Sequence, residues 1–389
     1  MLWITLIIAL LLLVLAATFL LFRAEDLSHL DETEHPVLDQ LPSDGHEAVL
    51  SRLKQMGRAT RGLKGRARLL ATREHLDHIS DDLPLTSDIR PQGARPGNTD
   101  PVQQERAPDR SQARGDSNAP GSNPLPRGEW VIAPGADTRR RLLYIHGGAW
   151  AVGSPRSHRG ITDALSNAAN AAVFAVDYRL MPEHRYIDGV RDCRDAYRWI
   201  LENGPDGPEP LAFLVVAGDS AGGSHTLGLL AWARDRGLRP ADAAIAFSPS
   251  TDLTFTAPSN RGNIATDPLL GPVFGGLSKL PLPVLWWGTL AAFRVSPTHP
   301  VASPLRGNLA NLPPTLIQAS ASEMLLDNAR RYTARARAAG SQVTLHTWPG
   351  MVHVWQLFVD LLPEAREAFE DVRNFLDEVE AKAPDRRSA

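Results

Sequence analysis

A serine lies at the centre of the short stretch Gly218 to Gly222 (GDSAG), which fits the G-x-S-x-G pattern. The apolar run 211–217 before it predicts a buried strand, and residues 223–234 after it have apolar side chains at helical spacing. A sharp turn between a strand and a helix exposes the hydroxyl, and small neighbours let the two elements pass closely. The pattern therefore predicts that Ser220 is the nucleophile of an acyl transfer.

A second glycine turn lies upstream of the serine. Residues 141–145 (RLLYI) predict a strand that runs into His146-Gly147-Gly148-Ala149. The glycines of such a turn expose backbone N–H groups to a ligand. Together with the N–H of Ala221, the N–H groups of Gly147 and Gly148 are predicted to form an oxyanion hole for the negative charge that develops when a carbonyl is attacked.

Together the two motifs resemble the hormone-sensitive-lipase-like branch of the α/β-hydrolase superfamily, also called the HGGG esterases. The resemblance covers about residues 128–380 and departs from the family at Ala149, which stands in place of a third glycine. It implies an α/β fold with a mostly parallel central sheet and helices on both faces. Further segments carry it: Asp177–Leu180, Pro182–Glu183, Ser248–Pro249, Thr251–Leu253, Ser303–Leu305, Leu312–Pro314 and Trp348–His353.

A serine hydroxyl needs a base, and the base needs an acid that orients it. The resemblance implies the chain order serine, acid, histidine, and it places the acid on Glu323, after the predicted strand 315–319. Most members of the family carry aspartate there, so Asp327 stays open as an alternative. Its other interpretation is a carboxylate in the first turn of a helix over 325–339, where it favours the helix dipole.

The base is predicted to be His353. It follows a strand over 343–348 and a Pro-Gly turn, and so lies on a loop at the carboxyl side of the expected sheet, where such folds place their chemistry. The other histidines near these motifs, His146, His184 and His346, are interpreted as structural or solvated.

The first 22 residues are almost entirely apolar and carry no charged side chain. A helix of that length crosses a hydrocarbon core of about 30 Å, so residues 1–23 predict a transmembrane anchor of a single-pass membrane protein. A cleaved signal peptide is the alternative, but the run is longer than the usual apolar region and lacks a basic beginning. Arg23 and the acidic residues after it do not determine which side of the membrane the enzyme faces.

Two segments separate the anchor from the enzyme. Residues 24–83 contain an apolar helical stripe with many basic residues around it. This helical segment is expected either to cap the active site, to lie on an anionic membrane surface, or to be a solvated helix weakened by glycines. Residues 84–127 are rich in Pro, Gly, Ser, Asn, Asp and Arg and predict a flexible linker. The catalytic domain is predicted over 128–380, with a tail over 381–389.

Composition excludes several classes of function. The chain of 389 residues has a net charge of −3, which does not favour a nucleic-acid partner. It contains no HExxH or CxxC motif, and its single cysteine, Cys193, lies in a helical stretch where packing is its expected role. No metal or other cofactor is therefore expected.

The sequence predicts a membrane-anchored serine carboxylesterase that hydrolyses small-molecule esters with short or medium acyl chains through an acyl-enzyme on Ser220. A deacetylase of a small acetylated compound with the same triad is one alternative. A non-catalytic binding protein on the same fold is another, although Ser220, Glu323 and His353 are all present. The sequence does not determine the oligomeric state.

Overall fold

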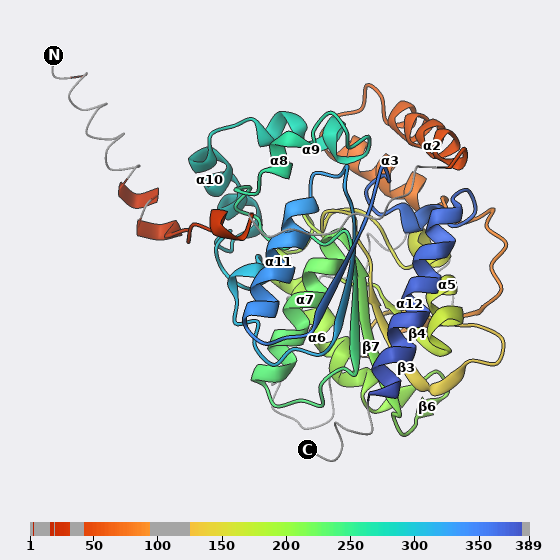
Figure 1. The fold of residues 1–389 in the computed structure, drawn as a ribbon. Coiled ribbons are helices and arrows are strands. Elements are labelled where there is room, and N and C mark those ends of the chain that lie inside the picture. Colours follow the sequence, from red (N-terminus) through yellow and green to blue (C-terminus); the bar gives the residue numbers. More distant parts are fainter. Residues whose placement is uncertain (1–2, 4–15, 19, 32–42, 94–124, 383–389) are drawn as a thin grey trace, which may run out of the picture.

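The structure is a computed structural model that describes residues 3, 16–18, 20–31, 43–93 and 125–382 (Figure 1). In this described part, eight strands form one sheet with the order β1-β2-β4-β3-β7-β8-β9-β10. The strands are β1 (Asp88–Gln92), β2 (Gly128–Ile132), β3 (Asp137–Ile145), β4 (Ala171–Val176), β7 (Phe213–Asp219), β8 (Ala243–Phe247), β9 (Thr315–Ser320) and β10 (Val343–Trp348). A separate small hairpin pairs β5 (Asn203–Gly204) with β6 (Gly207–Pro208).

The sheet is mostly parallel, as the sequence predicts. The six strands from β4 to β10 pair in parallel, whereas β2 is antiparallel to β4 and β1 is antiparallel to β2. The carboxyl ends of the parallel strands therefore meet at one edge, which is where open α/β sheets hold their ligands.

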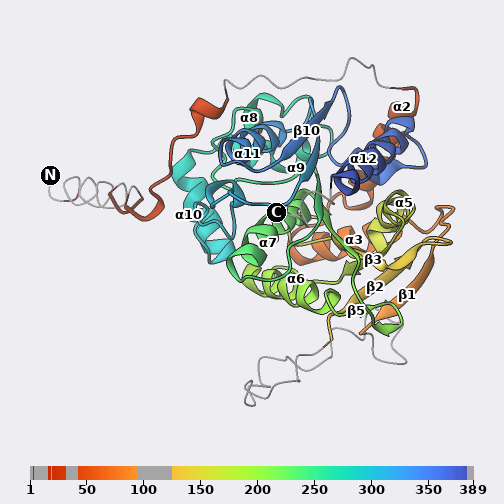
Figure 2. The same ribbon diagram turned by 60° about the horizontal axis from the view of Figure 1, so that its bottom comes forward.

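Helices cover both faces of the sheet, as Figure 2 shows end-on. One face carries α5 and α12, and the other carries α6, α7 and α11. Successive residues of β3 separate accordingly: Leu142 and Tyr144 join the core under α5 and α12, and Leu143 and Ile145 join the core on the other face. The helices are α5 (Arg159–Ala169), α6 (Tyr186–Ile200), α7 (Ser220–Asp235), α11 (Leu326–Ala338) and α12 (Pro363–Ala381).

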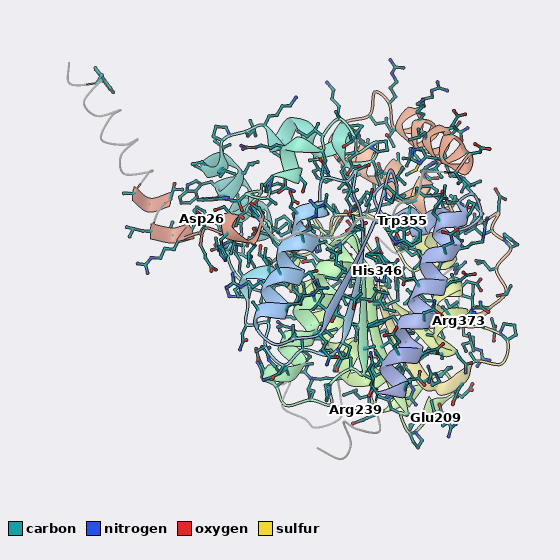
Figure 3. All side chains as sticks on the ribbon, viewed as in Figure 1. Asp26, Glu209, Arg239, His346, Trp355 and Arg373 are labelled. Carbon is teal, nitrogen blue, oxygen red and sulfur yellow. The ribbon has the colours of Figure 1, made fainter. Side chains whose placement is uncertain are left out.

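Additional helices lie outside these layers. In the described residues they are α2 (Gly45–Ala59), α3 (Gly65–Asp77), α8 (Ser259–Gly262), α9 (Leu270–Ser278) and α10 (Leu282–Phe293), with 3-10 turns η1 (Ser28–Leu30), η3 (Arg156–His158), η4 (Pro304–Arg306) and η5 (Trp355–Phe358). Figure 3 places Trp355 toward the end of the molecule that holds α2, and places Glu209 and Arg239 at the opposite end.

Within the helical segment predicted over 24–83, α2 packs on the chain that follows the carboxyl end of β10. Val49 of α2 is fully buried in a cluster with Trp355 and Phe358, and Leu50 and Leu53 pack against the same cluster. The apolar stripe of α2 therefore packs against the rest of the domain.

The predicted linker over 84–127 is wrong at its beginning. Residues Asp88–Gln92 form β1 and pair with β2 at the sheet edge. An edge strand is held by backbone pairing, so it needs few apolar side chains, and here only Ile89 packs against the core. A proline, Pro91, is tolerated there because an edge strand leaves some N–H groups unpaired. Residues 94–124 lie outside the described residues.

The predicted anchor falls mostly outside the described residues, which include only Trp3, residues 16–18 and residues 20–23 of it. Within the described chain, no helix is both long enough and apolar enough to span a membrane.

Candidate active site

Ser220 is the first residue of α7 and directly follows the last residue of β7. Its φ of 50° lies in the left-handed region that side chains other than glycine rarely adopt. Gly222 permits the tight turn, because a Cβ atom there would collide with the carbonyl oxygen of Ile145 on β3. The strained turn directs the hydroxyl away from the sheet, as the motif predicts.

His353 reaches the serine from the loop after β10. Its Nε2 lies 2.9 Å from the Oγ of Ser220, and its Nδ1 lies 2.6 Å from Oε2 of Glu323. This network assigns the tautomer: Nδ1–H donates to the carboxylate, and Nε2 accepts the proton of the serine. The imidazole is 2% exposed, so little water competes for these two bonds.

Glu323, rather than Asp327, occupies the acid position. Its fully buried side chain follows β9, and its second oxygen, Oε1, accepts the N–H of Ser320 at 3.2 Å. Asp327 instead accepts the N–H of Ser259 at 2.7 Å and pairs with Arg330. It lies in the first turn of α11, where its negative charge is favourable.

The electrostatics of the His353–Glu323 pair favour a strong base. Burial alone lowers the pKa of His353, but the hydrogen bond and the negative charge of Glu323 outweigh it, and the pKa is raised above its ordinary value. A raised pKa means a higher affinity for the proton that the imidazole takes from the serine.

Two positioning residues have no role in the sequence prediction. Ser248, at the end of β8, accepts the N–H of Val354 at 3.2 Å and hydrogen-bonds to Glu323, so it joins the histidine loop to the acid. Asp267, on the segment before α9, accepts the N–H of Met324 at 2.9 Å. The sequence could have indicated Ser248, because it lies at the carboxyl end of a predicted strand, where ligands bind in such folds. No pattern in the sequence distinguishes Asp267.

The oxyanion turn corrects one prediction. The N–H of Gly147 donates to Oδ1 of Asp219 at 2.8 Å, and the hydroxyl of Tyr144 donates to the same oxygen at 2.6 Å. The N–H of Gly147 therefore stabilises the turn and is not available to an oxyanion. Among the described residues, no acceptor is found for the N–H groups of Gly148 and Ala149.

The turn is fixed further by its histidine. Nδ1–H of His146 donates to the carbonyl of Gly147 at 2.8 Å, and the ring stacks on Tyr178 with centroids 4.4 Å apart. Burial lowers the pKa of His146 to about 3, so it stays neutral. Beyond the turn, Trp150 packs with Tyr186 and Ala221 in a small apolar cluster.

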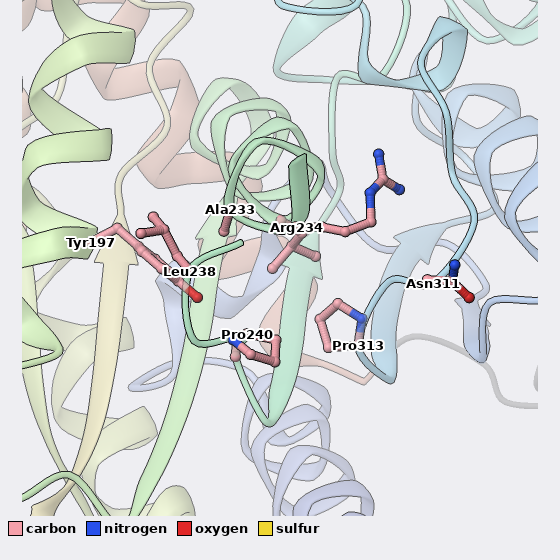
Figure 4. A pocket seen from close by; sticks show the side chains of 9 residues that line it. Tyr197, Ala233, Arg234, Leu238, Pro240, Asn311 and Pro313 are labelled. Carbon is pink, nitrogen blue, oxygen red and sulfur yellow. The ribbon is translucent and has the colours of Figure 1, made fainter. Parts of the chain in front are cut away.

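A pocket of about 230 Å³ lies away from the Ser220–His353–Glu323 site and contains no catalytic side chains (Figure 4). It lies beside the end of α7 and the beginning of β8, opposite the carboxyl ends of the strands. No carboxylate, histidine or thiol lines it, so it offers neither a base nor an acid. Its lining consists of Tyr197, Leu230, Ala233, Arg234, Leu238, Pro240, Ala241, Asn311 and Pro313.

Comparison with known proteins agrees with this geometry. A family described as alpha/beta hydrolase fold matches residues 142–357. The chain is an α/β-hydrolase. An acetyl-hydrolase of Streptomyces hygroscopicus is 41% identical to the hydrolase over 248 residues, which cover 64% of this chain and 78% of that protein. The esterase LipU of Mycobacterium tuberculosis is 35% identical over 250 residues, 64% of this chain and 80% of that protein.

Solved structures place the hydrolase within the hormone-sensitive-lipase-like branch. An esterase from the bacterial hormone-sensitive lipase family superposes with a TM-score of 0.68 and 29% identity, covering 87% of the hydrolase and 99% of that chain. The hydrolase acts on ester bonds. Within its described residues, no group of three or more His, Cys, Asp or Glu side chains could hold a metal ion.

Proposed function

We propose that the hydrolase cleaves esters of short or medium acyl chains by a two-step acyl transfer. One observation carries the proposal: a continuous hydrogen-bonded chain from Ser220 through His353 to Glu323. In the first step Nε2 of His353 takes the serine proton while Oγ attacks the ester carbonyl, and the resulting imidazolium protonates the leaving alcohol. In the second step the same imidazole activates water, which releases the acid from Ser220.

The oxyanion in both steps is assigned to the N–H groups of Gly148, Ala149 and Ala221. Gly148 has a φ of 107°, and a Cβ atom there would collide with the carbonyl of Val152, so glycine is required. The N–H of Ala221 lies in the first turn of α7, where backbone donors have no helical acceptor. Ala149 in place of a third glycine leaves its own N–H available.

The helices α2 and α3 are proposed to form the cap of the active site. Arg73 of α3 donates to the carbonyls of Ala151 and Met181 at 2.8 and 2.9 Å, and pairs with Glu183 at 2.8 Å. It therefore ties the cap to the oxyanion turn. Since the apolar stripe of α2 packs on the histidine loop, the cap is favoured over a helix lying on a membrane surface.

Small acyl groups are favoured by the aromatic residues near the nucleophile. Trp150 meets Tyr186 and Phe293 edge-on, with ring centroids 5.8 and 5.2 Å apart, and the rings of Tyr186 and Phe293 are tilted at 5.1 Å. Ala221 belongs to the same cluster. Rings packed so closely limit the space next to the oxyanion hole. A deacetylase of a small acetylated compound fits the same arrangement. The hydrogen bond from His353 to the buried carboxylate of Glu323 favours a catalytic protein over a binding protein, because ligand binding does not require an oriented base.

The apolar stretch Met1 to Phe22 is proposed to anchor the hydrolase in a membrane as a single span. The support is its length without a charged residue. Cell fractionation with carbonate extraction tests this part: the chain stays in the membrane pellet if the span is retained, and a shortened, soluble chain identifies a cleaved signal peptide.

The catalytic proposal is tested with the full chain in detergent micelles on p-nitrophenyl esters from acetate to laurate. Ser220→Ala is expected to lose roughly a thousandfold or more in kcat. A fluorophosphonate probe should label the parent protein at Ser220 and leave the variant unlabelled. A folded parent that neither hydrolyses any ester nor reacts with the probe would favour the binding protein. Hydrolysis of acetate alone would favour the deacetylase.

A further inference from the structure

The helices α9 and α10 and the turn between them carry apolar side chains that are exposed in the described part of the structure. Val273, Leu277, Leu280 and Val284 are 58%, 43%, 40% and 52% exposed, and we call these four residues the apolar surface. Between Pro268 and Phe293 the only charged residue is Lys279. In α10 only Leu285 is buried. A helix that is apolar nearly all round yet faces outward is unusual in a water-soluble domain and indicates an interaction site.

The chain directly after the predicted span is docked beside this surface. Phe22 is 1% exposed and packs on the rings of Trp286 and Trp287 at 5.6 and 5.3 Å. Figures 1 and 2 both show this part of the chain next to α10. The indole N–H of Trp287 donates to the hydroxyl of Thr18 at 2.8 Å, so contact with α10 begins within the predicted span.

Ion pairs hold the docked chain further along. Asp31 makes two bonds of 2.5 and 2.6 Å to Arg331, whose side chain is 3% exposed, and Glu25 pairs with Arg335 at 2.6 Å. Asp26, labelled in Figure 3, marks this part of the chain. Leu27 and Leu30 are buried in the core beneath α11. The domain is therefore fixed to the end of the span and cannot swing freely on a tether.

We propose that the apolar surface of α9 and α10 lies in the interface of the lipid bilayer that holds the span. The inference rests on the anchor proposed above. Leu20 and Leu21, at the end of the span, are 60% and 58% exposed, so the apolar surface continues onto the span itself. Trp286 and Trp287 lie where the span ends, and tryptophan is enriched at that level of a membrane. Lys279 is long enough to carry its charge out to the headgroups.

The apolar surface lies on elements that contact the active site. Phe293, at the end of α10, packs on Trp150 beside the oxyanion turn. Asn263, directly after α8 on the segment that leads to α9, donates to the carbonyl of Glu323 at 2.9 Å. Lipid contact with α9 and α10 would thus place the rings of Trp150 and Phe293, next to the oxyanion turn, at the membrane surface. The substrates that reach the active site would then be esters dissolved in the bilayer.

Depth measurements on the full chain test the proposal. Single cysteines are introduced at Leu277 and Val284 in a Cys193→Ala background, labelled with an environment-sensitive fluorophore, and placed in phosphatidylcholine nanodiscs that hold one copy. Arg236→Cys, at the opposite end of α7, and Leu63→Cys, an exposed leucine between α2 and α3, are the matched controls. Leu12→Cys reports on the span.

Nitroxide lipids labelled near the headgroup should quench the probes at 277 and 284 several-fold more than those at 236 and 63, while deep nitroxides quench the probe at 12. Quenching at 12 with 277 and 284 matching the controls would overturn the docking and leave the anchor standing. No quenching at 12 would overturn the anchor, and the docking with it. One copy per nanodisc excludes shielding by a second molecule.

Activity provides an independent readout. The double variant Leu277→Lys/Val284→Lys is expected to hydrolyse the acetate ester of a long-chain alcohol, dissolved in the nanodiscs, at least several-fold more slowly, with unchanged hydrolysis of water-soluble p-nitrophenyl acetate. Ala339→Lys/Ala381→Lys, two exposed apolar residues at the carboxyl ends of α11 and α12, is the matched control and should change neither rate. Equal rates on the membrane ester for both double variants would contradict substrate supply from the bilayer.

Discussion

Replacing Glu323 by glutamine tests the assignment of the acid most directly, because its two oxygens have different tasks. Oε1 accepts the N–H of Ser320 at 3.2 Å, and Oε2 accepts the N–H of His353 at 2.6 Å. Glutamine offers one acceptor oxygen and one NH2 group. If the oxygen faces His353, the NH2 group faces the N–H of Ser320, and two donors meet in a fully buried space. If the amide is reversed, its N–H donates to Nδ1.

The second arrangement selects the wrong tautomer. An imidazole that accepts at Nδ1 carries its proton on Nε2, so it cannot take the proton of Ser220. The first arrangement keeps the tautomer but loses the charge that stabilises the imidazolium. We therefore expect kcat/KM to fall about 10³-fold, which at ~1.36 kcal/mol per factor of ten is ~4 kcal/mol of transition-state stabilisation.

The pH profile of kcat/KM separates an electrostatic role from a structural one. The reaction needs neutral His353, so activity falls on the acid side as the imidazole is protonated. Glu323 raises the pKa of His353, and burial opposes it. Removing the negative charge leaves burial dominant, so the acid limb of the residual activity in Glu323→Gln should move to lower pH. A merely misfolded fraction would lower the rate at every pH without moving the limb.

Two variants serve as controls. Glu323→Asp keeps both acceptors and the charge on a side chain one methylene shorter, as in most of the family, and should retain more activity than Glu323→Gln. Asp327→Asn removes charge from a carboxylate that serves Ser259 and Arg330, and should change kcat/KM less than about threefold. If Glu323→Gln kept activity within tenfold of the parent while Asp327→Asn lost a hundredfold, the assignment of the acid would be refuted.

Three further predictions follow from contacts around the site. Asp219→Ala leaves the hydroxyl of Tyr144 and the N–H of Gly147 buried without an acceptor, so kcat should fall by about ten- to a hundredfold, whereas Asp219→Asn keeps an oxygen and should be milder; p-nitrophenyl acetate kinetics compare them. Arg73→Met unties the cap from the oxyanion turn and should raise KM more than it lowers kcat, with the exposed Arg90→Met as the unaffected reference. Cys193 is buried and burial raises the pKa of its thiol, so iodoacetamide should modify it only after unfolding, as mass spectrometry of the intact protein would show.

The sequence by itself determined the elements and the chemistry that each carries. Apolar runs and helical spacing are local properties of the sequence. For this reason the strands around 141–145, 315–319 and 343–348 and the helix over 325–339 are found within a few residues of their predicted positions. The residues next to Ser220 likewise predict its strained turn, because only small residues fit between β7 and α7.

Only the tertiary structure decided which groups meet. Glu323 and Asp327 are four residues apart, and a sequence pattern cannot say which carboxylate reaches His353, because that depends on how the loops after β9 and β10 approach one another. The oxyanion donors depend in the same way on Asp219, which ends the neighbouring strand β7 and accepts the N–H of Gly147. Edge pairing of β1 uses the backbone, which every residue possesses, so composition could not reveal it. A hydrogen bond between distant parts of the chain is a property of the fold and leaves no periodic trace in the sequence.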